Sequence, residues 1–347
     1  MVSYNIDYLE AKRRPSSPPL KKNNGSTSSK ESAGGTVNTP PSVTERERVE
    51  TSRPMEEYNW LNYVAYTTYA PLYLAGPILT FNDFMFQSRT TLVYSINFKR
   101  ISMYAIRFAF CLLTMEVLLH YTYVVAISQT RAWTGDTPFQ ISMIALFNLN
   151  VIWLKLLLPW RLFRLWAMLD RIDPPENMVR CVNNNYSAIL FWRSWHRSFN
   201  RWIIRYVYIP LGGSKRTLLN SLIVFMFVAI WHDIQLRLLL WGWLVVLFIL
   251  PEVLASLLFP AKKWGSNSIY RHLCAIGGVA NVWMMMIANL VGFCVGLDGV
   301  SEMLHDMIYT ADGIKYVILS SLALFVGLQA MFEFREREKR MGINLRC

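Results

Sequence analysis

The sequence predicts an all-α polytopic membrane protein, and three observations carry that prediction. Six long apolar stretches run through the chain after about residue 100. Hydrophobic residues make up 53% of the 347 residues, compared with roughly 45–50% in an average soluble domain. The chain also holds 13 Trp and 17 Tyr residues, which suit a protein with many bilayer interfaces, where such amphipathic rings settle.

The six apolar stretches are predicted to be transmembrane helices, because a span needs about 20 apolar residues. They cover residues 101–127, 138–159, 217–232, 235–259, 273–297 and 314–333. Residues 59–80 are also apolar but contain Pro71, Gly76 and Pro77, which predicts a broken or re-entrant element. Residues 161–171 mix arginines with apolar side chains, a pattern that predicts a short amphipathic helix at the interface.

The first 57 residues have a different composition. They are rich in Ser, Thr, Pro, Asn and charged residues, with almost no bulky apolar residues after Leu20. Such a segment cannot bury enough surface to offset the entropy of ordering. We therefore predict a disordered polar arm over residues 1–57 and a transmembrane domain over residues 58–347. An alternative for the arm is a regulatory segment phosphorylated at serines such as Ser16 and Ser28.

The chain has a formal net charge of +12. The positions of the basic residues along the sequence indicate what this charge is for. They separate apolar stretches, which is the pattern of cytosolic loops under the positive-inside rule, so no nucleic-acid partner is predicted. The basic tail after Phe334 is accordingly placed in the cytosol, and the acidic loop 298–313 in the lumen. Counting back through the spans places His232 toward the luminal end of its helix.

Two histidines in this apolar sequence are the main candidates for chemistry, since ionisable side chains inside a membrane are costly and usually functional. His232 ends the apolar run Leu222–Trp231. Burial there favours the neutral imidazole, which suits a general base. The alternative is a histidine that hydrogen-bonds between helices. The other histidines, His120, His272 and His305, lie at the ends of apolar stretches and are predicted to be interfacial.

The second histidine, His196, lies in a basic and aromatic segment. His196 and Asn200 are four residues apart, so they share a face if the segment is helical. Four arginines at the same spacing form a second row: Arg193, Arg197, Arg201 and Arg205. This arrangement suits an anionic ligand, such as the phosphate groups of a nucleotide-containing acyl donor. The alternative is a juxtamembrane helix whose arginines reach lipid phosphates.

Other kinds of site find no support in the sequence. The five cysteines are dispersed without a CxxC pair, so neither a metal site nor a disulfide framework is predicted. There is also no serine nucleophile elbow, HExxH motif or Walker loop. Two kinds of function therefore stay open: an enzyme that transfers a group directly with a histidine as base, and a non-enzymatic transporter.

The segment Phe191–Ser214, followed by Trp231 and His232, resembles the membrane-bound O-acyltransferase (MBOAT) family. The segment Tyr69–Phe84 is similar to the upstream signature of that family, and the segments Asp173–Met178 and Asn183–Tyr186 resemble its fungal glycerol uptake protein subfamily. The similarity begins near residue 58. It implies an MBOAT-like multi-helix bundle with re-entrant elements and an internal tunnel. Because family members usually have several transmembrane helices before this signature, we expect this chain to lack them.

The resemblance also implies roles for individual residues. His232 falls on the family's general base, and His196 falls on the second catalytic position. Asp233 stands where many members have glycine. The remaining residues of the family motifs are expected to position the donor or the acceptor: Asn200, Arg193, Arg197, Arg201, Arg205, Tyr206, Trp195, Trp231 and Asp233.

The implied reaction is O-acyl transfer from acyl-CoA to a lipid hydroxyl. Acyl-CoA is a co-substrate that enters from the cytosolic side, and no permanently bound cofactor is expected. The subfamily resemblance implies that the acceptor is the lyso-phosphatidylinositol of a glycosylphosphatidylinositol (GPI) anchor, and that the protein lies in the endoplasmic reticulum membrane, with the plasma membrane as a further location. The alternative is a glycerol–proton symporter, although no inverted repeat of broken helices is evident. A third reading is an inactive fragment that acts as a membrane interaction partner.

Overall fold

The computed structural model describes residues 1–13, 44–90, 96–130, 132, 133 and 135–343. These residues form helices joined by turns, with no β-strand among them, which confirms the all-α prediction. Six of the helices are long and apolar enough to cross a membrane. The prediction of a multi-pass membrane protein is therefore confirmed.

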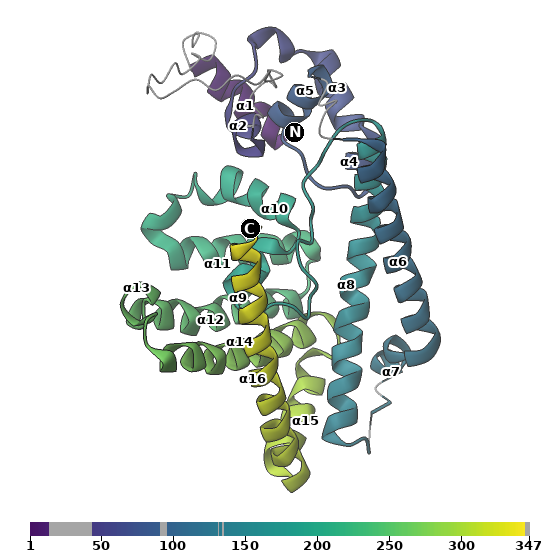
Figure 1. Ribbon diagram of the computed structural model, residues 1–347. Helices are drawn as coiled ribbons and strands as arrows, with labels where there is room; N and C mark the ends of the chain where they lie inside the picture. Colours follow the sequence, from purple (N-terminus) through teal and green to yellow (C-terminus); the bar gives the residue numbers. More distant parts are fainter. Residues whose placement is uncertain (14–43, 91–95, 131, 134, 344–347) are drawn as a thin grey trace, which may run out of the picture.

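Each of the six long helices coincides with one predicted span. They are α6 (Phe98–Thr122), α8 (Pro138–Leu169), α11 (Thr217–His232), α12 (Leu236–Leu258), α14 (Ser268–Phe293) and α16 (Ala311–Arg340). In Figure 1, α6 and α8 lie side by side along the length of the molecule, while α11, α12 and α14 form a stack that runs across the view. The helix α16 crosses this stack and packs against α14.

The shorter elements occupy the ends and corners of the molecule. They are α1 (Val2–Arg13), α2 (Glu45–Glu50), a 3₁₀ turn (Met55–Glu57), α3 (Trp60–Thr68), α4 (Ala70–Leu74), α5 (Phe81–Arg89), α7 (Val124–Thr130), α9 (Ala188–Ser194), α10 (Arg197–Ile203), a π turn (Ile204–Tyr208), a 3₁₀ turn (Gly213–Arg216), α13 (Ala261–Trp264) and α15 (Gly296–Tyr309). The helices α1, α2, α3 and α5 gather at one end, above α10 (Figure 1).

The prediction of a disordered arm is wrong for residues 2–13 and 44–57, which are folded. Ala11 of α1 is buried in a cluster with Tyr58 and Phe81, and the carboxyl group of Asp7 accepts a hydrogen bond from Tyr206. The helix α2 begins with a complete capping box at Thr44. The arm is stabilised by apolar and charged partners elsewhere in the chain, which its own composition does not reveal. Ser16 and Ser28 lie outside the described residues.

Two further expectations concern short elements. The predicted break in residues 59–80 is present, because α3 ends at Thr68 and α4 begins at Ala70. The separate interfacial helix predicted over residues 161–171 is wrong, since most of that segment continues α8 to Leu169. The reason is that Arg164 turns inward and pairs with Asp173 and Glu176, so the basic residues of this segment do not form an interfacial face.

Candidate active site

His232 is the last residue of α11, and its ring meets two other helices of the stack. Its centroid lies 5.8 Å from that of Trp241 on α12 and 5.7 Å from that of Phe293 on α14. The neighbouring Trp231 ring lies 5.0 Å away. The packing of α11 on α12, and of α12 on α14, thus places an imidazole among aromatic rings.

His196 occupies the junction between α9 and α10, with φ +42° and ψ +52°. Its ring stacks on Trp160 of α8 with a centroid distance of 4.3 Å. It also lies 5.0 Å from the ring of Phe199 and 6.0 Å from that of Trp231. The structure thus brings His196 to the same aromatic cluster as His232, with Trp231 as their shared neighbour.

The surroundings of His196 fix its protonation state. Burial among the aromatic rings, with a smaller contribution from the nearby His232, lowers the pKa of His196 from 6.5 to about 3. An imidazole with this pKa is neutral at pH 7. A neutral imidazole carries one N–H donor and one acceptor nitrogen, so it can orient or polarise a reacting group without holding a charge.

Asn200 does not join His196 on one face of a continuous helix. The helix α9 ends at Ser194, and α10 begins at Arg197, so the expected single helix is wrong. The side-chain amide of Asn200 donates to the backbone oxygen of Trp192 over 3.2 Å. Asn200 therefore ties α10 to α9, and its backbone N–H bonds to the carbonyl of His196 over 3.0 Å.

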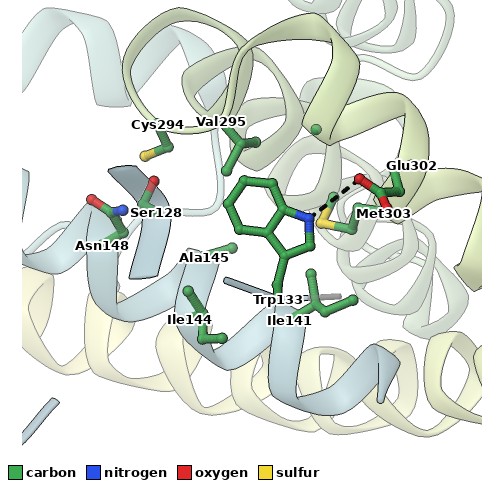
Figure 2. A pocket seen from close by; sticks show the side chains of 11 residues that line it. Ser128, Trp133, Ile141, Ile144, Ala145, Asn148, Cys294, Val295, Glu302 and Met303 are labelled. Carbon is green, nitrogen blue, oxygen red and sulfur yellow. Dashed lines mark hydrogen bonds between the residues drawn. The ribbon is translucent and has the colours of Figure 1, made fainter. Parts of the chain in front are cut away.

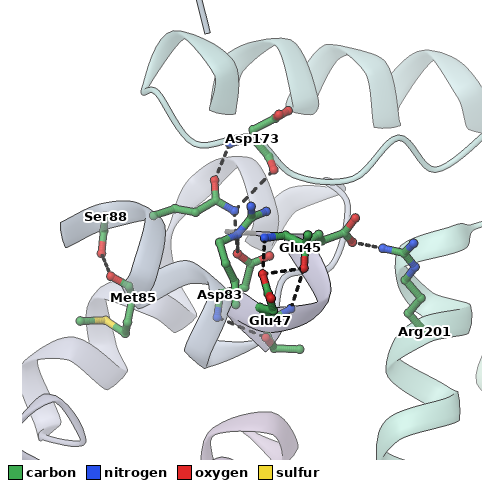
Figure 3. A network of polar contacts seen from close by, with 11 residues as sticks. Glu45, Glu47, Asp83, Met85, Ser88, Asp173 and Arg201 are labelled. Atoms are coloured by element: carbon green, nitrogen blue, oxygen red, sulfur yellow. Dashed lines mark hydrogen bonds and ion pairs between the residues drawn. The ribbon is translucent and has the colours of Figure 1, made fainter. Parts of the chain in front are cut away.

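The four arginines do not form a continuous ladder either, because the same break separates Arg193 from the others. Arg201 pairs with Glu45 of α2, as Figure 3 shows. Arg205 pairs with Asp7 at 3.2 Å and with Glu10 at 2.9 Å. These two arginines therefore hold the N-terminal helices, which sequence periodicity could not indicate.

The other expected site residues have mostly structural contacts. Tyr206 is buried, and its hydroxyl donates to Asp7 over 2.9 Å. Trp195 stacks on Phe191 with a centroid distance of 5.4 Å. The carboxylate of Asp233 accepts hydrogen bonds from the N–H of Ile234 and from the side chain of Gln235, within the turn that joins α11 to α12.

Two cavities are lined by residues close to this region. The first, of about 20 Å³, has room for one water molecule. It lies beside Cys294 and Val295, directly after Phe293, and Trp133 donates to Glu302 across it (Figure 2). The second is an open groove of about 430 Å³ between α2, α5 and α10. Neither is lined by His196 or His232, so the internal tunnel stays a prediction.

Sequence reasoning missed four aromatic residues and one amide at the site. The rings are Trp160, Phe199, Trp241 and Phe293, which a sequence cannot distinguish from ordinary lipid-facing or core aromatics. The amide is Asn177, whose backbone and side-chain oxygens accept hydrogen bonds from the N–H groups of Arg197 and Ser198. The only sequence feature that pointed to Asn177 was its position in the segment Asp173–Met178, which resembles the fungal subfamily. No group of three potential metal ligands occurs among the described residues.

Comparison with known proteins shows similarity to membrane-bound acyltransferases. The model of the membrane-bound O-acyltransferase family matches residues 3–297. The chain is 58% identical to "Membrane-bound O-acyltransferase GUP1" of Candida tropicalis and 57% identical to the protein of that name in Saccharomyces cerevisiae, in each case over all of this chain. It spans 58% and 60% of the lengths of these two relatives. It is also 30% identical, over half its length, to "Protein-cysteine N-palmitoyltransferase HHAT" of Mus musculus, of which the match covers 36%.

Proposed function

Because the chain belongs to the membrane-bound O-acyltransferase family, we propose that it transfers a fatty acyl group from acyl-CoA to a lipid hydroxyl. The observation that carries the proposal is the meeting of His196 and His232 at Trp231, although one lies between α9 and α10 and the other ends α11. Two imidazoles from distant segments thus meet in one aromatic cluster of a membrane protein, where ionisable side chains are costly and usually functional.

In the proposed reaction, the imidazole of His232 accepts the proton of the acceptor hydroxyl as its oxygen attacks the thioester carbonyl carbon. The carbon–sulfur bond then breaks, and the leaving CoA thiolate takes the proton back from the imidazolium of His232. The neutral His196 is proposed to orient the reacting groups through its N–H, as a hydrogen-bond donor that needs no proton transfer. Its low pKa, about 3, supports this division of roles.

The donor's phosphate groups are proposed to approach the segment that contains α9 and α10. Arg193 is exposed on α9, whereas Arg201 and Arg205 have carboxylate partners. A phosphate at the latter two arginines would compete with Glu45, Asp7 and Glu10, since one guanidinium offers a limited set of donors.

For the acceptor, we propose the lyso-phosphatidylinositol of a GPI anchor, with re-acylation in the endoplasmic reticulum membrane. The proposal follows from the fungal subfamily that the motifs resemble and from the high identity to the fungal relatives. Membrane lipids, acyl-CoA and a GPI-anchored protein or lysolipid would then be the partners of the chain.

The test is His232→Ala in membranes that contain the chain, with radiolabelled acyl-CoA and lyso-phosphatidylinositol. Loss of a general base costs about 10²–10⁴-fold in rate, so acyl transfer should fall to background while membrane insertion is unchanged. His305→Ala is the control, because that side chain is 67% exposed. Undiminished acyl transfer by the His232→Ala variant would contradict the proposed mechanism. Proton-driven glycerol accumulation in reconstituted vesicles without any acyl transfer would favour the symport alternative.

A further inference from the structure

His196 has a backbone conformation that its residue type rarely adopts. Its φ of +42° lies in the left-handed region, where residues with a Cβ are uncommon and strained. His196 is also the N-cap of α10, but its side chain makes no capping hydrogen bond. Both the strain and the uncapped N–H groups of α10 need compensation from elsewhere in the chain.

Asn177 supplies that compensation from a distant segment. Its backbone oxygen accepts a hydrogen bond from the N–H of Arg197 over 3.1 Å. Its side-chain Oδ1 accepts one from the N–H of Ser198, also over 3.1 Å. Because Asn177 is only 1% exposed, water cannot replace these bonds. The two N–H groups that immediately follow His196 are therefore capped by one buried residue.

The segment that holds Asn177 is itself firmly anchored. The carboxylate of Asp173 forms an ion pair with Arg164 at 2.9 Å. The backbone N–H of Asp173 donates to the side chain of Gln87 over 2.7 Å, a contact of Asp173 that Figure 3 draws. Glu176 accepts a hydrogen bond from the hydroxyl of Tyr104 over 2.9 Å. These bonds to α5, α6 and α8 give Asn177 a fixed position from which to hold α10.

We propose that Asn177 is a positioning residue for His196: it caps α10 from outside and holds the His196 backbone in its left-handed conformation, so that the imidazole stacks on Trp160 beside Trp231. The catalytic part of this inference rests on the proposed acyl transfer. Asn177 itself touches no substrate and acts only through the backbone of α10.

Two variants separate the acceptor oxygen from the rest of the side chain. Asn177→Ala removes the Oδ1 that Ser198 uses. Asn177→Asp keeps an acceptor oxygen at that place and replaces Nδ2, which has no hydrogen-bond partner among the described residues, with a second carboxyl oxygen that can face the N-terminal N–H groups of α10. Asn82→Ala is a matched control, because Asn82 is also fully buried, its Oδ1 also accepts one hydrogen bond, and its Nδ2 is likewise without a partner there.

The first measurement does not depend on activity. The full chain in detergent is treated with diethyl pyrocarbonate, which modifies neutral imidazoles, and the rate at each histidine is followed by peptide mass spectrometry. Since Trp160 covers one face of the His196 ring, we expect slow modification in the wild type, about tenfold faster modification in Asn177→Ala, and wild-type rates in Asn177→Asp and Asn82→Ala. His120, His272 and His305 should react at the same rate in every variant.

The second measurement is steady-state acyl transfer. Misplacing a catalytic group by about 1 Å can cost on the order of 10²-fold in rate, so Asn177→Ala should lower kcat by about tenfold to a hundredfold, with little change in the KM for acyl-CoA. Asn177→Asp should restore most of the rate, which a general loss of stability would not explain.

Three results would overturn the inference. One is an unchanged His196 modification rate in Asn177→Ala, and another is an equal increase in Asn82→Ala. The third is an Asn177→Asp variant whose His196 is exposed; this variant decides the question if Asn177→Ala does not fold. If the wild-type chain transfers no acyl group, the proposed function fails, and the modification rates still decide whether Asn177 positions His196.

Discussion

At the scale of single residues, the half-buried His196 and the buried Asp7 give the folded state opposite responses to pH. Burial lowers the pKa of His196 to about 3 from 6.5, so the unfolded chain binds a proton there between these values and the folded chain does not. Burial raises the pKa of Asp7 to about 6 from 3.8, despite lowering contributions from Tyr206 and Arg205, so there the folded chain holds the additional proton. On acidification from pH 6 to pH 4, His196 therefore destabilises the fold and Asp7 stabilises it.

Single variants should separate these two responses. With Asp7→Asn, the remaining His196 should lower the free energy of unfolding as the pH falls from 6.5, by up to about 1.4 kcal/mol per pH unit. With His196→Asn, a residue that tolerates positive φ, the remaining Asp7 should raise it as the pH falls from 6 to 4. Melting temperatures in detergent at a series of pH values provide the measurement. Parallel pH slopes in the two variants would contradict both assignments.

At the scale of helices, the approach of α12 to α14 depends on a glycine next to the site. A Cβ on Gly292 would lie 2.8 Å from Cγ of Trp241, and the ring of Trp241 packs against those of His232 and Phe293. On the same helix α14, a Cβ on Gly277 would meet nothing within 4 Å. The two glycines thus form a matched pair that differs in the contact with Trp241.

Gly292→Ala should displace Trp241, whose ring packs against His232, and destabilise the fold by about 1–3 kcal/mol, as overpacked cores do, with a fall in acyl transfer. Gly277→Ala should be neutral or stabilise the fold by about 0.5–1 kcal/mol, because alanine is the better helix former. Thermal unfolding and transfer rates of the two variants, measured side by side, test the expectation. Equal effects would show that the contact with Trp241 is unimportant.

The helices also show what the sequence could and could not predict. The six spans were predictable because their length and apolarity are local properties, and His232 was identifiable because it ends one of them. The break at His196 was not predictable, since the N–H groups that follow it donate hydrogen bonds to Asn177, a residue about 20 positions earlier in the chain. The helix α1 was missed for the same reason, because the groups that stabilise it, Arg205 and Phe81, are distant in sequence.

At the scale of the whole molecule, the candidate site is assembled from helices that are far apart in the sequence. The helices α8, α10, α11, α12 and α14 each contribute one or more aromatic or imidazole rings. The N-terminal helices reach α10 and the π turn through Glu45, Asp7 and Glu10. This packing fixes both histidines within the helix bundle. The orientation of the bundle in the membrane therefore decides from which side each substrate reaches the histidines.

The charge distribution predicts that orientation, and an engineered glycosylation site can test it. The carboxylates of α15, which include Glu302 and Asp306, predict that this helix faces the lumen, whereas Lys262 and Lys263 of α13 predict a cytosolic position for that helix. Ile308→Asn places an acceptor asparagine two residues before Thr310, on an exposed position of α15. Trp264→Asn creates the equivalent motif before Ser266, next to α13.

In microsomal membranes, only the Ile308→Asn variant should gain a glycan relative to the wild type, because glycosylation occurs on the luminal side of the membrane. The measurement is the gel mobility of each variant before and after treatment with a glycosidase. A glycan on the Trp264→Asn variant alone would show that the bundle has the opposite orientation in the membrane. His232 would then lie toward the cytosolic side, and the acceptor would have to reach it from the side now assigned to acyl-CoA.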